Sequence, residues 1–163
     1  MALLARFAGL FPAAMYRVPV PNPFGRTLGM MVWVRAYDEW VHRQDIRRAL
    51  GLGDEDVDVA SVGEFLLASI GATIVPRLKG RTGTIEVSLQ GAPVDPWTYD
   101  LASGAGRQGE HRSAEARIAA PAQAFIMAAA GRDPFDRLAD EGRMKIEGDE
   151  RLGRAFLAEV RVV

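Results

Sequence analysis

The sequence predicts an α+β protein in which helices come first and a domain of mixed helices and strands follows. Helical spacing dominates residues 1–52, whereas alternation with a period of two begins only at Gly83. The length of 163 residues leaves room for one ordinary domain or two small ones. We therefore expect a helical part at 1–52 and an α+β domain at 53–163, whose sheet is mainly antiparallel.

The helical part is predicted as two helices joined by a proline-rich connector. An apolar stripe near the N-terminus suits one helix that packs against a neighbour. The run at 18–25 cannot be helical because three of its residues are prolines. Thr27 is a good N-cap and Gly51 a good C′ residue, which predicts a long helix over 28–50. The stripe consists of Leu3, Phe7, Leu10 and Phe11.

The second part is predicted to alternate between helices and short strands. A helix over 57–75 is expected to end at Pro76. Ile85, Val87 and Leu89 then alternate on one face of a strand. The other predicted strands are 98–101, 114–119 and 143–147, and the other predicted helices are 121–131, a short one around 135–138, and 150–159 with Asp149 as its cap.

Composition excludes several classes of function. Twenty basic and 21 acidic residues give a net charge of −1, which argues against a nucleic-acid binder that relies on bulk charge. The absence of cysteine excludes disulfides, cysteine-ligated zinc, iron–sulfur clusters and a cysteine nucleophile. The N-terminus lacks the basic start of a signal peptide, and no apolar run looks long enough to cross a membrane. We expect a cytoplasmic protein without membrane or nucleic-acid partners.

One group of residues on the long helix carries chemistry. Asp38 and His42 lie four residues apart and Asp45 three further, so all three share one helix face. We expect this to be the packed face, because Met31 and Val34 lie beside it. The carboxylate and imidazole are then suited to hold a divalent metal ion, zinc above all.

A simpler interpretation of the same residues is a pair of ion pairs. Asp38 would then bind His42, and Asp45 would bind Arg48, with no metal present. Acid–histidine pairs at this spacing are common on helices, and a catalytic zinc normally takes three protein ligands. His111 is the only other histidine and lies in a glycine-rich stretch, predicted to be an exposed loop. The three tryptophans are predicted to be packing residues.

Two stretches carry a resemblance to a known family. The stretch from Trp40 to Gly51 resembles the W-x-H-x-x-D-I-x-x-A-x-G signature of the mycothiol-dependent maleylpyruvate isomerase-like proteins, which are relatives of the DinB metal-binding four-helix bundles. The stretches 124–134 and 144–154 are similar to that family's C-terminal domain, which resembles the sterol-carrier-protein-2 fold. The resemblance runs over nearly the whole chain.

The resemblance implies a metal-dependent thiol enzyme. Asp38 and His42 would be metal ligands, with aspartate in place of the family's glutamate, and Asp45 would orient an imidazole or bind Arg48. The metal would be Zn²⁺ or another divalent ion. Because the chain has no cysteine, a low-molecular-weight thiol such as mycothiol would be a cofactor beside a small-molecule substrate. The family's catalytic arginine cannot be placed, since Arg117 and Arg143 are both candidates.

The chain departs from the family at its start, because it begins at what resembles the third bundle helix. A partial bundle leaves apolar side chains such as Met31 and Val34 uncovered, which predicts a homo-oligomer or a chain missing its beginning. Three hypotheses follow. The protein is a mycothiol-dependent isomerase or thiol transferase, a non-catalytic sterol-carrier-like module that binds small molecules, or an inactive remnant.

Overall fold

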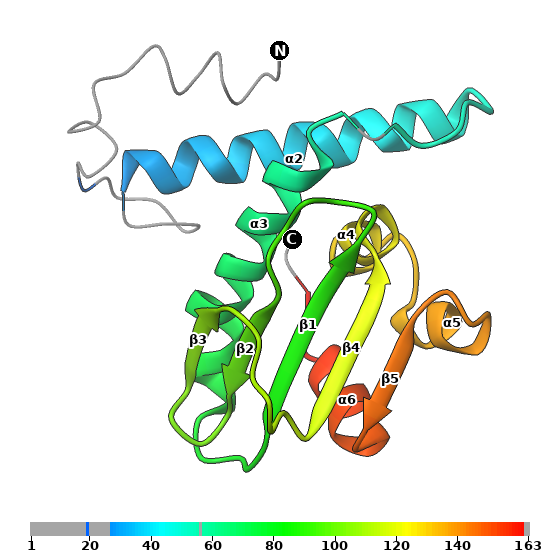
Figure 1. Cartoon of the computed structure of the whole chain (residues 1–163). Coiled ribbons are helices and arrows are strands. Elements are labelled where there is room, and N and C mark those ends of the chain that lie inside the picture. Colours follow the sequence, from blue (N-terminus) through cyan, green and yellow to red (C-terminus); the bar gives the residue numbers. More distant parts are fainter. Residues whose placement is uncertain (1–18, 20–26, 56, 162–163) are drawn as a thin grey trace. The chain divides into compact units, whose positions relative to one another are not determined.

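The computed structural model describes residue 19 and the segments 27–55 and 57–161, and the chain divides into two compact units, Met1–Val62 and Gly63–Val163 (Figure 1). The predicted N-terminal helix and nearly all of the proline-rich connector lie outside the described residues. The boundary between the units falls later in the chain than the predicted one between residues 52 and 53.

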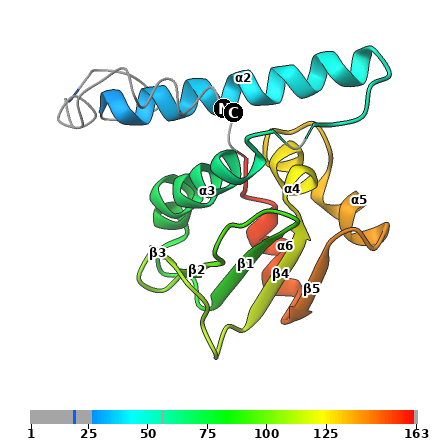
Figure 2. The same ribbon diagram turned by 45° about the horizontal axis from the view of Figure 1, so that its top comes forward.

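The long helix of the first unit is α2, Leu28–Ala49 (Figure 2). Its ends are as predicted: the Thr27 hydroxyl accepts a hydrogen bond from the Met30 N–H at 3.3 Å, and Gly51 follows the helix with φ of 69°. The prediction that the side of α2 with Asp38 and His42 is the packed side was wrong. The buried residues of α2 are Gly29, Ala36, Tyr37, Trp40, Val41 and Gln44.

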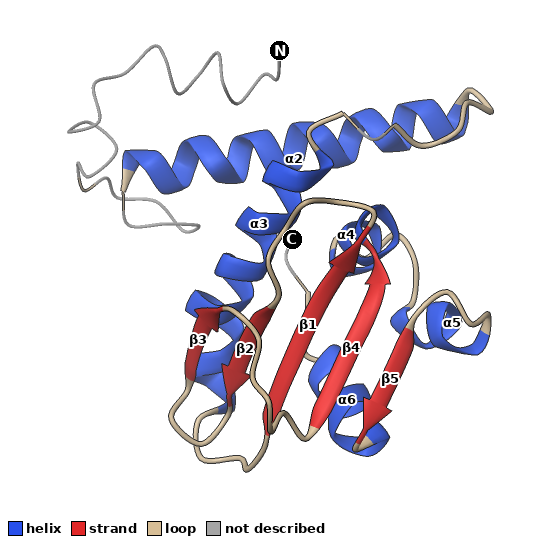
Figure 3. Ribbon diagram, in the orientation of Figure 1, coloured by secondary structure: helices blue, strands red, loops and turns tan. Residues whose placement is uncertain are grey.

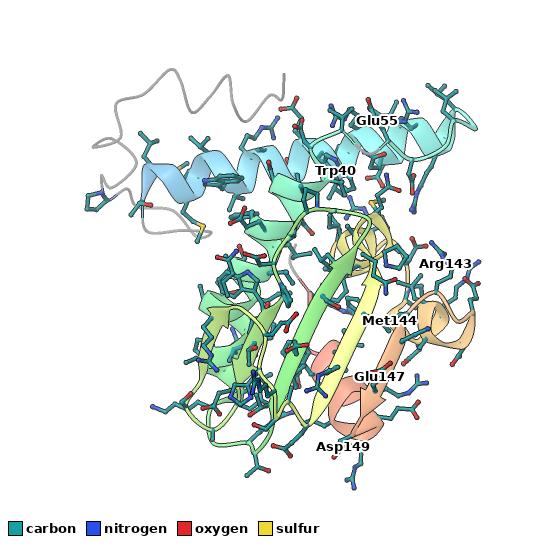
Figure 4. All side chains as sticks on the ribbon, viewed as in Figure 1. Trp40, Glu55, Arg143, Met144, Glu147 and Asp149 are labelled. Atoms are coloured by element: carbon teal, nitrogen blue, oxygen red, sulfur yellow. The ribbon has the colours of Figure 1, made fainter. Side chains whose placement is uncertain are left out.

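Polar side chains of α2 fix the segment that follows the helix. The Gln44 amide is fully buried and pairs with the Glu55 backbone, accepting from its N–H at 2.9 Å and donating to its carbonyl at 3.4 Å. The Trp40 indole donates to the Val57 carbonyl at 2.9 Å, and Arg47 donates to the Gly53 carbonyl at 2.8 Å. Figure 4 shows Trp40 on α2 and Glu55 on the segment beside it. These bonds satisfy backbone groups that no regular element would pair.

The next helix is less regular than the sequence predicts. It begins as α3, Val59–Ser69, widens into a π-helical turn at Ile70–Ile74, and tightens into a 3-10 helix at Val75–Leu78. Pro76 therefore lies inside the 3-10 helix and does not simply end an α-helix.

The stretch Val59–Leu78 is apolar and long enough to cross a membrane, which contradicts the expectation that no apolar run has that length. However, 61% of its most apolar window is buried inside the protein, as in the core helix of a folded domain.

The second unit is built on a five-stranded sheet in the order β3-β2-β1-β4-β5 (Figure 3). β1 and β4 pair in parallel, and the other three neighbouring pairs are antiparallel, so the predicted mainly antiparallel sheet is confirmed. The glycine-rich segment predicted as a loop contributes an edge strand, β3. The strands are β1 Thr84–Gln90, β2 Trp97–Asp100, β3 Ala105–Gln108, β4 Ala116–Pro121 and β5 Lys145–Gly148.

Alternation along the strands gives the sheet one apolar and one polar face. Ile85, Val87 and Leu89 are buried as predicted, and their neighbours along β1 are only partly buried. Three helices follow β4: α4 Ala122–Ala129, α5 Phe135–Asp140 and α6 Glu150–Leu157. α4 contacts β1 and β4, and α6 contacts β4 and β5. The predicted cap Asp149 accepts from the Leu152 N–H at 2.9 Å.

Candidate functional site

The predicted metal ligands come together on α2. The His42 Nε2 lies 3.4 Å from the Asp38 Oδ1, and the His42 Nδ1 lies 3.3 Å from the Asp45 Oδ2. Arg35 donates to the other Asp38 oxygen at 2.9 Å. The imidazole therefore sits between two carboxylates, with a positive charge close to one of them.

This cluster, Asp38–His42–Asp45, lies on the more exposed side of α2 and not on the packed side predicted for it. The side chains of His42, Asp38 and Asp45 are 59%, 43% and 34% exposed. Among the residues that the structure describes, no group of three histidine or acidic side chains is arranged to hold a metal ion. The observed contacts are those of a histidine between two carboxylates, and a zinc ion held by Asp38 and His42 stays a prediction.

Arg48 contacts the segment that follows α2, and the predicted pair of Asp45 with Arg48 stays a prediction. Its guanidinium binds the Asp54 carboxylate through two hydrogen bonds of 2.9 Å and 2.8 Å, and Asp45 lies beside His42. Two parallel bonds of this kind are the favoured geometry of an arginine–carboxylate pair. The arginine helps to fix the segment after α2.

The apolar face of the sheet meets α3 and its π-helical turn through aromatic residues. Tyr99 is buried and stacks between two rings, with centroid distances of 6.3 Å to Trp97 and 5.4 Å to Phe156. Its hydroxyl donates to the Leu67 carbonyl at 2.8 Å. Burial raises the pKa of the Tyr99 phenol well above its usual value, so the group stays neutral and acts as a donor. We call this region the helix–sheet layer: residues 63–78, β1–β5, and the helices α4 and α6 that contact the sheet.

A glycine pair sets the thickness of the helix–sheet layer beside Tyr99. A Cβ atom added to Gly106 would lie 2.8 Å from the Gly71 Cα and 2.9 Å from the Tyr99 Cδ1. A Cβ atom on Gly71 would lie 3.4 Å from the Trp97 Cζ3. Side chains at these two positions would push the π-helical turn away from β2 and β3, which explains why the edge strand carries glycine there.

The polar face of the sheet carries a second group of charges. Glu86 on β1 accepts from the His111 N–H at 2.7 Å, and its other oxygen lies 3.6 Å from the Arg117 Nε on β4. Arg117 also donates to the carbonyls of His111 and Arg112, at 3.2 Å and 2.8 Å. Side chains of β1 and β4 therefore hold the backbone of the predicted exposed loop at residues 111 and 112. Of the two arginines considered as catalytic, Arg117 fixes this loop, and Arg143 lies 3.5 Å from Glu141.

Solved structures with a similar fold come from several organisms. The stereoselective inverting sec-alkylsulfatase Pisa1 from Pseudomonas sp. matches with a TM-score of 0.53 and 14% identity, over 68% of this chain. The chain spans only 18% of the length of that sulfatase. Palmitated SCP2L2 from Aedes aegypti matches with a TM-score of 0.49 and 17% identity, over 66% of this chain and 96% of that one. Sterol carrier protein 2 from Yarrowia lipolytica matches with a TM-score of 0.43 and 16% identity, over 64% of this chain and 91% of that one.

The sequence comparison identifies the family. A search of curated proteins finds no match. Residues 68–158, more than half of the chain, match the SCP-2 sterol transfer family. This stretch begins in α3, includes the π-helical turn and all five strands, and ends just after α6. The predicted sterol-carrier-like half is confirmed, whereas no comparison supports the maleylpyruvate isomerase or DinB resemblance of the first half. The chain belongs to the SCP-2 sterol transfer family.

Proposed function

We propose that the chain is a non-catalytic module that binds a small apolar molecule of the lipid class in its helix–sheet layer. Family membership over residues 68–158 carries the proposal. The side chains of this layer suit such a ligand, because those that face the interior are almost all apolar. Its fully buried side chains include Leu66, Leu67, Ile70, Ile85, Ile118, Ile126 and Met127.

The π-helical turn supports the same proposal. π-Helical turns are rare and are frequent at functional sites, because they interrupt the regular ladder of helix hydrogen bonds. Here the turn lies over β3 and next to Tyr99, where Gly71 and Gly106 bring the backbones together. An apolar ligand could enter between helix and sheet at small cost if this stretch of helix shifts, because its hydrogen bonds are already irregular.

Methyl NMR tests the proposal without a variant. Delipidated protein is titrated with a sterol and, separately, with a C16 fatty acid. We expect shifts of the methyl signals of Leu67, Ile70 and Ile85, which are buried in the helix–sheet layer. The methyl signals of Ile46 and Leu50 serve as controls, because both side chains are exposed, one on α2 and one directly after it. Unmoved signals in the layer at saturating concentrations of both ligands would refute the proposal.

The thiol-dependent isomerase is the second candidate, and the contact between Asp38 and His42 is the observation that favours it. These two residues would hold a divalent ion, with Asp45 orienting the imidazole from its other nitrogen. Such an ion supplies Lewis acidity that lowers the pKa of a bound thiol, here mycothiol or a similar compound. The association of two chains through α2, which the sequence predicts, is a separate proposal that does not depend on the metal ion.

A further inference from the structure

The side chain of Trp97 has a buried hydrogen-bond donor that the fold does not use. The indole Nε1 is buried and, among the described residues, has no hydrogen-bond partner. The Trp40 indole, in contrast, donates to the Val57 carbonyl at 2.9 Å. A buried N–H without an acceptor costs about 1–3 kcal/mol, and most such groups in proteins are satisfied. A retained donor of this kind therefore needs an explanation.

Trp97 lies beside the π-helical turn of the helix–sheet layer. It begins β2, stacks on Tyr99, and its six-membered ring lies under Gly71 of the π-helical turn. The Tyr99 hydroxyl is not a free donor for a ligand, because it already donates to the Leu67 carbonyl. Trp97 as a whole is partly exposed although its nitrogen is buried, which places the ring at the margin of the layer.

Ser69 is the other buried donor of this unit without a hydrogen-bond partner among the described residues. It precedes Gly71 by two residues, so the two positions are about 200° apart around the helix axis. Since Gly71 faces Trp97, Ser69 faces a different side of the helix. The unused donor at the contact between the π-helical turn and the sheet is therefore the indole N–H of Trp97.

We propose that the Trp97 indole N–H binds an uncharged oxygen atom, a hydroxyl or carbonyl, at the polar end of the lipid ligand. An indole N–H only donates, so its partner must be an acceptor. The contacts of Trp97 given above are Tyr99 and Gly71, which carry no charge at neutral pH. The charged residue closest to it in sequence is Asp95, an exposed acid that binds Gln108 at 3.2 Å.

The charge of the surroundings decides between ligand classes. Burying a carboxylate without a positive partner costs far more than burying a neutral oxygen, and neither Tyr99 nor Gly71 supplies such a partner. The oxygen of a long-chain alcohol, a sterol or an ester instead carries no charge and can accept from one donor. The ligand class is therefore an uncharged amphiphile, an inference that rests on the proposed function.

The first measurement follows the indole signals in a ¹H–¹⁵N spectrum of the unaltered protein. We expect dodecan-1-ol to move the Trp97 indole proton downfield and dodecane to leave it in place. The Trp40 indole is an internal control, because its donor is already used by Val57. Equal shifts with both ligands would mean that a resident water or ring packing is responsible, and would overturn the inference.

The second measurement compares affinities. Trp97→Phe keeps a ring for stacking on Tyr99 but removes the N–H, and we expect it to weaken dodecan-1-ol binding about fivefold and dodecane binding less than twofold. The matched variant Trp33→Phe, on α2, should bind both ligands as the unaltered protein does. Equal weakening of both ligands by Trp97→Phe would assign the residue to packing alone. If dodecane binds but the alcohol has no advantage over it, the anchor is refuted and the proposed function stands; if neither ligand binds, the anchor is refuted and the sterol and fatty-acid titration decides the proposed function.

Discussion

The segment that follows α2 and the helix–sheet layer are stabilised in opposite ways. Side chains of α2 hold that segment by donating to its backbone carbonyls, as Trp40 does to Val57 and Arg47 to Gly53. The layer is held by buried apolar side chains and three stacked aromatic rings. In the layer, the Tyr99 hydroxyl joins sheet to helix by donating to the Leu67 carbonyl.

The difference between the two regions extends to their surfaces. Every exposed large apolar side chain among the described residues belongs to α2 or to the segment after it: Met31, Ile46, Leu50, Leu52 and Val57. Apolar residues thus occur on more than one side of α2. None of these exposed side chains lies in the helix–sheet layer, so that region gains more from hydrophobic burial.

The largest contrast is expected from truncating one apolar side chain in each region. Phe125 is fully buried in α4 with its ring 5.2 Å from that of Phe135, so Phe125→Ala should lower the free energy of unfolding by about 3–5 kcal/mol. Ile46 is 61% exposed, so Ile46→Ala should change it by less than about 0.5 kcal/mol. Urea denaturation measures both. Similar losses for the two variants would contradict the comparison.

A smaller contrast is expected from adding one methyl group in each region. Gly106→Ala places a Cβ against the Gly71 Cα, a backbone atom that cannot rotate away, and should cost about 1–3 kcal/mol. Gly53→Ala adds the same atom where no other atom lies within 4 Å, and φ there is not in the left-handed region. We expect Gly53→Ala to be neutral or slightly stabilising. Thermal unfolding measures both, and a stable Gly106→Ala would show that the layer can expand.

The same contrast explains what the sequence could predict. Alternation at Ile85, Val87 and Leu89 gave the correct buried face of β1, because one residue out of register would expose the whole set. The caps Thr27 and Asp149 were correct because their hydrogen bonds are local. The facing of α2 was wrong because apolar residues occur on several of its sides, and its buried side includes the polar Gln44.

Three features had no local signal strong enough to predict them. β3 contains glycine and polar residues without alternation, and it forms because β2 offers a free edge and Gly106 permits the approach of Gly71. The π-helical turn in Ile70–Ile74 has an ordinary apolar helix sequence. The unused indole of Trp97 depends on which acceptors the fold brings near, which spacing alone does not reveal.

Removing the Tyr99 hydroxyl tests the polar link within the helix–sheet layer. Tyr99→Phe leaves the Leu67 carbonyl without this donor and should lower the free energy of unfolding by about 1 kcal/mol at pH 7. The raised pKa in the folded state adds a dependence on pH. The stability that it contributes is complete below the unfolded-state pKa of about 10 and is lost as the pH rises from there through the folded-state value.

The unaltered protein should therefore lose stability more steeply above about pH 10 than Tyr99→Phe does. Urea denaturation at a series of pH values between neutral and strongly alkaline gives both slopes. Identical slopes would mean that the buried phenol is not what makes the folded state sensitive to alkali, and that its ring stacking on Phe156 is the main contribution of Tyr99.

The smallest effect is expected at the Asp38–His42–Asp45 cluster, where zinc distinguishes a metal site from an ion pair. A two-ligand site that is partly exposed binds weakly, and Zn²⁺ at a concentration about equal to its dissociation constant should stabilise the protein by about 0.4 kcal/mol. Thermal unfolding with and without Zn²⁺ should show this gain for His111→Ala, which keeps the cluster, and not for Asp38→Ala or His42→Ala. An unaltered protein that does not respond to Zn²⁺ would leave His42 as an imidazole held by two carboxylates. The first unit would then contribute no metal chemistry through α2, and the lipid-class ligand of the helix–sheet layer would account for the function.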